Sequence, residues 1–332
     1  MRKRYRKKYV FAILLLILFA VLLISVNSGY ANLPYSQVLI SLLHPGSIES
    51  SVVLLKIRLP RILLAVLCGM GLALSGCILQ AVAENPLADP GILGINAGAG
   101  FTGMLFLTAF PELHTGTMLF QPLFAMVGGL LSAGILYGFA MRNGKLRPSY
   151  LLLGGIGVSA GFSALMLIMS ADMENSSYQL VARWLSGNIW GTSWYQVKAL
   201  LPYLLILIPL IFTRANILDL LLLGEESSLA LGVQVERERR ILLVTAVALA
   251  SSCISVSGGI GFVGLVAPHI ARKLVGGRHQ VLLPASMLSG GLLLLLADTA
   301  GRSFFQPIEI PVGIVIAVVA APYFLYLLHK QG

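Results

Sequence analysis

Charged residues are scarce in this chain. Asp, Glu, Lys and Arg make up 11% of its 332 residues, whereas soluble globular domains carry about 25%. Hydrophobic residues account for 57% of the sequence, and its mean hydropathy is +0.89. These values are typical of a protein that is embedded in lipid. They predict an all-α, polytopic membrane protein that forms a single transmembrane domain over residues 1–332.

Cysteine is rare as well, and the histidines are scattered. Cys68, Cys77 and Cys253 all fall in apolar stretches. The first two would lie about 13 Å apart along one helix, which is too far for a disulfide, since its Cα atoms must approach within about 7 Å. The five histidines show no paired spacing with cysteine or an acidic residue that is typical of a metal site. We therefore expect no metal site and no cofactor.

Nucleotide-binding and catalytic motifs are missing. The sequence contains no G-x-x-x-x-G-K-[ST] loop, and its Gly144-Lys145 pair continues with leucine. Gly155, Gly157 and Gly161 could suggest a phosphate loop, but they lie in an apolar run, where small residues let helices pack closely. We expect that the chain is not an enzyme and has no catalytic residues, so any ATP must be hydrolysed by another subunit.

Ten apolar runs have about the length of a membrane helix. Roughly 20 residues at ~1.5 Å each cross a ~30 Å hydrocarbon core, and residues 62–83 contain no formal charge. The first run follows MRKRYRKK but has no clear cleavage site, so it is interpreted as a retained span and not a signal peptide. The expected spans are 9–28, 59–82, 92–110, 118–141, 149–171, 197–213, 241–257, 259–273, 281–299 and 308–328.

Acidic residues are outnumbered, and the net charge is +10. A nucleic-acid partner would need a basic patch on one soluble face, but here the charges lie between apolar spans. With the N-terminus inside, most of the lysines and arginines fall on the inner side, as the positive-inside rule requires. The pattern predicts a multi-pass membrane protein, surrounded by lipid, with both termini cytoplasmic and no nucleic-acid partner.

The centres of the predicted spans lack acidic residues, histidine and lysine. Ion-coupled carriers usually keep such residues at membrane depth, whereas Asp298, Glu309, His269 and Arg272 lie near the ends of spans. An external energy source is therefore favoured, although an ion-coupled secondary transporter remains the alternative from a different class.

The longest inner link, residues 214–240, carries the pattern of a short amphipathic helix. Its glutamates suit a positive helix N-terminus, and glycines punctuate both ends. The alternative is a helix lying on lipid, but anionic headgroups would repel its acidic residues. Docking to a partner protein is favoured. The candidate residues are Leu223, Gly224, Glu225, Glu226, Leu231 and Gly232, and Leu229 is a further apolar position of the same helix.

Five ordered segments carry a family resemblance. They are RLPR (58–61), NPLADPGILG (85–94), LGEES with LGV (223–233), GFVGLVAPHIAR (261–272), and the series Asp298, Arg302, Pro307, Glu309, Pro311 and Gly313. Together they resemble the FecCD-type permeases, which are subunits of binding-protein-dependent ABC importers for iron-siderophores, haem and cobalamin. The resemblance covers nearly the whole chain.

The resemblance implies a ten-span permease with two inverted repeats, spans 2–5 and spans 7–10. Such a permease pairs with a second copy or a paralogue, giving a homo- or heterodimer. It also binds two cytoplasmic ATP-binding cassette subunits and an extracellular substrate-binding lipoprotein or periplasmic binding protein. The segments 91–100 and 304–314 look most like ferric-siderophore permeases of Gram-positive bacteria, with cobalamin or haem as the alternative substrate.

The resemblance also implies roles for particular residues. Arg58, Arg61 and Arg302 match outer arginines that receive acidic residues of the binding protein, although arginines at helix ends also commonly snorkel to headgroups. The 223–233 helix resembles the segment that seats in the ATPase. The translocation pathway is expected along the small face of span 5. The candidate pathway residues are Gly154, Gly155 and Ser159.

Overall fold

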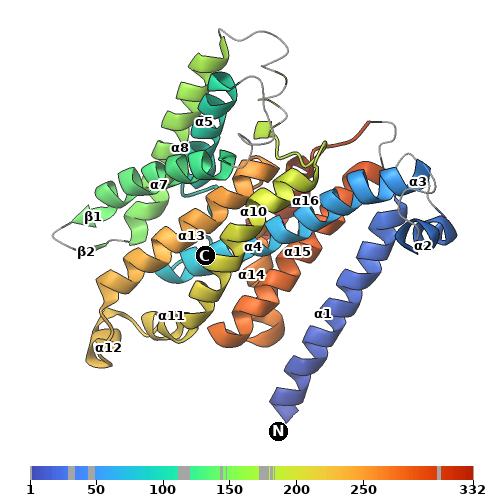
Figure 1. The fold of residues 1–332 in the computed structure, drawn as a ribbon. Coiled ribbons are helices and arrows are strands. Elements are labelled where there is room, and N and C mark those ends of the chain that lie inside the picture. The colour runs from blue at the N-terminus through green and yellow to red at the C-terminus, as the bar shows by residue number, and fades with distance from the viewer. Residues whose placement is uncertain are drawn as a thin grey trace.

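The fold is a bundle of helices, seen here in a computed structural model (Figure 1). The structure describes residues 2–28, 34–43, 49–110, 120–142, 145–146, 148–171, 179, 182, 184–304 and 308–331. The early elements are α1 (Arg2–Asn27), α2 (Tyr35–Leu43), α3 (Glu49–Val52), the π-helix η1 (Val53–Arg58), α4 (Leu59–Val82), α5 (Ile95–Ala109), α7 (Gln121–Ala140) and α8 (Pro148–Ala171). The later ones are α10 (Trp194–Thr213), α11 (Ala215–Leu221), α12 (Glu225–Ala230), α13 (Val235–Ser257), α14 (Val263–Val275), α15 (His279–Ser303) and α16 (Val312–Gln331). A two-stranded pair, β1 (Met141–Arg142) with β2 (Lys145–Leu146), links α7 to α8.

Each of the ten predicted spans contains one helix, so the all-α membrane fold is confirmed. Among the described residues, seven helices are long and apolar enough to cross a membrane. α5 and α14 are shorter, with 15 and 13 residues, or about 22 and 20 Å. The start of the fourth predicted span (118–119), Gly144 and Pro307 lie outside the described residues.

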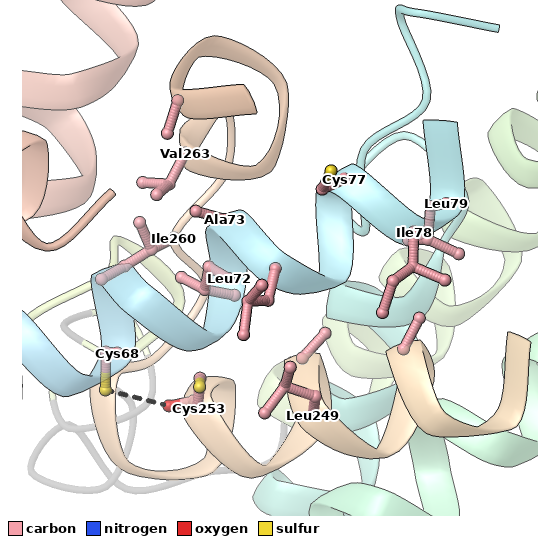
Figure 2. Close-up of a cluster of buried hydrophobic side chains, with 14 of the residues drawn as sticks. Cys68, Leu72, Ala73, Cys77, Ile78, Leu79, Leu249, Cys253, Ile260 and Val263 are labelled. Carbon is pink, nitrogen blue, oxygen red and sulfur yellow. Dashed lines mark hydrogen bonds between the residues drawn. The ribbon is translucent and has the colours of Figure 1, made fainter. Parts of the chain in front are cut away.

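α4 is the central helix, and it packs against α13, α14 and α15. Figure 2 shows α4 lying between α13, which contributes Leu249 and Cys253, and the segment that carries Ile260 and Val263. The Cys68 thiol donates to the Cys253 carbonyl at 3.8 Å, and all three cysteines are buried and free.

Glycine permits the closest of these crossings. A Cβ atom on Gly69 would lie 2.3 Å from the Gly290 carbonyl oxygen of α15, and one on Gly76 would lie 1.9 Å from the Gly264 carbonyl oxygen of α14. Both distances are far below van der Waals contact. α4 can therefore reach α14 and α15 only because these positions lack side chains.

The order of packing is repeated along the chain. α5 packs on α7 as α14 packs on α15, while α13 packs on α7 as α4 packs on α15. Both short helices also start in the same way, after a non-helical stretch whose last residue has a left-handed backbone: Gly94 (φ 80°) before α5 and Phe262 (φ 65°) before α14. This correspondence agrees with two related halves, as the resemblance implies for spans 2–5 and 7–10.

Polar side chains on both sides of the NPLADPGILG segment (85–94) join the two halves near the start of α14. The Gln80 side chain donates to the Gly264 carbonyl at 3.1 Å, and Asn96 donates to the Ile260 carbonyl at 3.2 Å. Asp89 is buried and accepts from the Gly91 amide at 2.8 Å. Burial raises its pKa to about 6, although the backbone amides of Gly91, Phe262, Ile92 and Leu265 act in the opposite direction.

Candidate partner-binding ends and pathway surface

The predicted short helix in the 214–240 link is present as α12 and starts at Glu225. We call residues 214–240 the coupling segment. The two glycines that punctuate it, Gly224 and Gly232, have φ values of 92° and 81°, a backbone region that other residues rarely adopt. Glu225 and Glu226 occupy the first turn of α12, where the positive end of the helix favours negative charge.

The coupling segment presents apolar side chains to its surroundings. Leu223, Leu229 and Leu231 are 58%, 55% and 60% exposed, respectively, and Glu226 beside them is exposed as well. Exposed leucines so close together in the chain form a surface that a partner protein can cover. Figure 1 shows α11 and α12 at the lower side of the molecule, where α1 also begins.

Ion pairs hold the base of the coupling segment, and the sequence reasoning missed them. Arg214 Nη1 lies 2.5 and 2.6 Å from the two carboxylate oxygens of Glu238. Arg214 precedes α11 in the chain and Glu238 follows α12, so this ion pair joins the two ends of the segment that contains both helices. Arg239 is buried and pairs with Glu84, which follows α4. The paired residues are 24 and 155 positions apart. The charge run ERERR at 236–240 was their only signal in the sequence.

The structure brings Arg58, Arg61 and Arg302 together, as predicted, but buries them. They are 5%, 7% and 5% exposed. The Arg61 guanidinium lies 2.9 Å from Asp298 Oδ1 and 2.8 Å from Glu309 Oε2, and Arg302 Nε lies 3.1 Å from Asp298 Oδ2. We call these five residues the arginine cluster. Carboxylates of the same chain therefore already pair with Arg61 and Arg302.

The arginine cluster also caps α1. Arg302 donates to the carbonyl oxygens of Ser28 and Ser25 at 3.1 and 3.3 Å and to Ser25 Oγ at 2.7 Å, while Arg58 donates to the Val26 carbonyl. The last carbonyls of a helix have no partner within it, so arginines from two other helices satisfy them. The cluster thus joins the end of α1 to the beginning of α4 and the end of α15. Whether it also receives a binding protein stays a prediction.

The predicted pathway residues lie on α8 in two different environments. Gly155 is buried against the segment before α5, since a Cβ atom there would lie 2.6 Å from the Ile92 carbonyl oxygen. Ser159 donates to the Gly91 carbonyl at 3.5 Å. Gly154, in contrast, borders an open apolar groove of about 960 Å³ between α7 and α8, together with Gly157 and Gly161. Their role in transport stays a prediction.

No group of three or more His, Cys, Asp or Glu side chains capable of holding a metal ion occurs among the described residues. The site therefore consists of helix surfaces, ion pairs and an apolar groove. A bundle of apolar helices of membrane length defines the class of multi-pass membrane proteins.

The comparisons with known proteins place the chain within that class. A family model, the FecCD transport family, matches residues 15–330, so the chain belongs to this family. It is 44% identical over 327 residues to an iron(3+)-hydroxamate import system permease protein of Bacillus subtilis, covering 97% of both chains. It is also 38% identical over 284 residues to a cobalamin import system permease protein of Halobacterium salinarum, covering 85% of this chain and 74% of the relative.

A solved structure has the same fold. An inward-facing conformation of a putative metal-chelate type ABC transporter superposes with a TM-score of 0.82 at 30% sequence identity. The match covers 98% of this chain and 99% of that one. The family resemblance that the sequence segments carried is therefore confirmed.

Proposed function

We propose that this protein is the permease subunit of an ABC importer that moves ferric siderophores across the bacterial cytoplasmic membrane, using ATP hydrolysed by separate subunits. The observation that carries the proposal is its 44% identity, across 97% of both chains, to an iron(3+)-hydroxamate import permease. The exposed leucines of the coupling segment support it, because a permease without a nucleotide site of its own needs such a surface to receive the ATPase.

The coupling segment would face the cytoplasm and seat in the ATPase. Its leucines would become buried on binding, and burying each one stabilises the complex by roughly 1.5–3 kcal/mol. The first turn of α1 lies at the same side of the molecule as α12 (Figure 1), which fits an N-terminus in the cytoplasm. The arginine cluster then lies at the extracellular end, where a substrate-binding lipoprotein or periplasmic binding protein would dock.

A second permease copy or a paralogue would cover the groove between α7 and α8. This groove is lined by apolar side chains, including Phe139, Tyr150 and Phe162. A path for a bulky ligand between two permeases needs small residues on the facing helices, and Gly154, Gly157 and Gly161 provide them.

Single cysteines test the dimer. A Cβ atom on Gly157 would meet no other atom within 4 Å, so this position accepts a side chain, and the same holds for Gly134, which borders a separate crevice between α7 and α13. The natural cysteines are buried. Gly157→Cys in both permeases of the transporter should therefore form a cross-linked dimer, and Gly134→Cys should not. Equal cross-linking by both variants would remove the groove from the interface.

Substrate uptake tests the function. The permease, reconstituted with its partner permease, ATPase and binding protein, should accumulate a ferric hydroxamate in proteoliposomes and should not accumulate cobalamin or haem. The 38% identity to a cobalamin import permease keeps cobalamin as the second candidate. ATP-dependent accumulation of cobalamin or haem without any ferric siderophore would reverse the substrate assignment and retain the importer.

A further inference from the structure

A buried contact fastens the coupling segment to α15. Asp219 of α11 accepts two hydrogen bonds at one carboxylate oxygen, from the backbone N–H of His279 at 2.8 Å and from its ring Nδ1 at 2.7 Å. His279 is the first residue of α15 and its side chain is completely buried, whereas the Asp219 side chain is 28% exposed. Because the first amides of a helix have no partner within it, Asp219 caps α15 from a different helix.

α11 and α12 are also tied to each other. The Ser228 hydroxyl of α12, fully buried, lies 2.8 Å from the carbonyl oxygens of both Leu220 and Gly224. The Arg214–Glu238 ion pair closes the base of the segment around both helices. These contacts connect α12 to α11, and Asp219 connects α11 to the beginning of α15.

α15 reaches from this contact to the arginine cluster. It runs over 25 residues, or about 37 Å, and it carries Asp298 and Arg302 near its other end. Asp298 binds Arg61 of α4 there. One helix is thus held by side chains at both of the ends where the partner proteins are proposed to bind.

We propose that Asp219 is a positioning residue that makes α15 follow the coupling segment, so that ATPase motion and receptor docking act on each other through this helix. The inference rests on the proposed function. Energetic coupling between two binding sites commonly changes an affinity about 5–150-fold, and we expect the loss of this coupling to have an effect of that order. The ATPase-binding surface itself is made by other residues, including Leu229 and Leu231, and should stay intact.

The test uses the complete transporter in proteoliposomes. Asp219→Ala should reduce the stimulation of ATP hydrolysis by loaded binding protein about fivefold or more and should raise the ATP consumed per substrate transported, while the ATPase still co-purifies. Asp219→Asn keeps an oxygen that can accept from the His279 amide. The stimulation of ATP hydrolysis in this variant should lie between those of the wild type and Asp219→Ala. Thr213→Ala is the matched control, because it removes an exposed local contact to the Leu210 carbonyl just outside the coupling segment.

A cross-link separates loss of coupling from loss of folding. Asn216 of α11 and Gln280 of α15 are exposed and joined by a 2.8 Å hydrogen bond. Introducing N216C and Q280C into the Asp219→Ala variant and joining them with a short thiol-specific cross-linker should restore the stimulation, and cleaving the linker should abolish it again. A variant that is merely misfolded would not respond.

The outcomes distinguish failure of the role proposed for Asp219 from failure of the proposed importer function. If Asp219→Ala keeps the wild-type stimulation and the wild-type ATP use per substrate, or if the cross-link restores nothing, the role of Asp219 is overturned. If loaded binding protein fails to stimulate ATP hydrolysis in the wild-type transporter, the proposed function itself fails.

Discussion

The arginine cluster and the coupling segment differ in burial: one contains buried charged side chains, and the other contains exposed apolar side chains. In the arginine cluster, the three arginines are buried and carboxylates of the same chain lie against Arg61 and Arg302. In the coupling segment, three leucines are more than half exposed. At one end, Arg61 and Arg302 pair with carboxylates of the same chain, and at the other end apolar side chains are exposed and available to a partner. A partner can bury new surface at the coupling segment, but at the arginine cluster it must add to existing ion pairs or exchange with them.

This difference predicts which substitutions damage folding and which damage assembly. Removing one member of a buried ion pair leaves an uncompensated charge and commonly costs about 3–5 kcal/mol. Removing an exposed apolar side chain costs the free chain little, because that side chain gains its burial only on binding.

The largest effect is expected at Asp298, which is 2% exposed and lies between Arg61 and Arg302. Asp298→Ala should lower the free energy of unfolding by about 3–5 kcal/mol, measured by denaturation of the purified permease in detergent. Glu309→Gln is the control, since the Glu309 side chain is 37% exposed and an exposed pair contributes about 1 kcal/mol or less. Equal losses in the two variants would contradict the description of a buried cluster.

The next effect concerns the exposed leucines. Leu229→Ser combined with Leu231→Ser should weaken binding of the ATPase by about 3 kcal/mol or more, because two side chains lose their burial on binding. The thermal midpoint of the free permease should stay unchanged. Titration of ATPase onto permease in nanodiscs measures the affinity. A double variant that unfolds early but binds normally would place the leucines inside the fold instead.

A smaller effect is expected from the two glutamates at the start of α12. Glu225→Lys combined with Glu226→Lys puts positive charge at the positive end of a helix and should weaken ATPase co-purification by about 1 kcal/mol. The same nanodisc titration applies. If the doubly substituted permease held its ATPase and transported normally at native expression, these glutamates would have no role in coupling.

The smallest effect tests whether the arginine cluster also receives the binding protein. Glu309, whose side chain is partly exposed, pairs with the Arg61 guanidinium. It therefore competes with any carboxylate of a partner for this guanidinium. Glu309→Gln should therefore speed the association of loaded binding protein, more at low salt than at about 1 M, where screening shortens to about 3 Å. Association rates across a salt series measure this. An unchanged rate at every salt concentration would leave the arginines with a purely structural role.

The sequence predicted what depends on local pattern. Each of the ten apolar runs contains a helix of the structure, and two glycines flanking an acidic turn located α12. Boundaries were less accurate. The helix of the third span begins at Ile95 and not at residue 92, because the residues before it form turns that end at the left-handed Gly94, and the helix of the seventh span begins at Val235 and not at residue 241.

What the sequence could not predict depends on residues far apart in the chain. Arg61 and Asp298 are 237 positions apart, and Asp219 and His279 are 60 apart. An arginine at a helix end looks the same in a sequence whether it faces water, a headgroup or a buried carboxylate. The sequence therefore did not indicate that carboxylates of the same chain pair with Arg61 and Arg302, and docking of the binding protein at the three arginines stays a prediction.

The most direct measurement is substrate accumulation in proteoliposomes that contain the whole transporter, followed with the proton gradient collapsed by an ionophore and, separately, with an ATPase that binds but does not hydrolyse ATP. An ATP-driven permease predicts that uptake of the loaded ferric siderophore continues without the gradient and stops with the inactive ATPase. Uptake that survives the inactive ATPase and disappears with the gradient would contradict this account and identify an ion-coupled carrier.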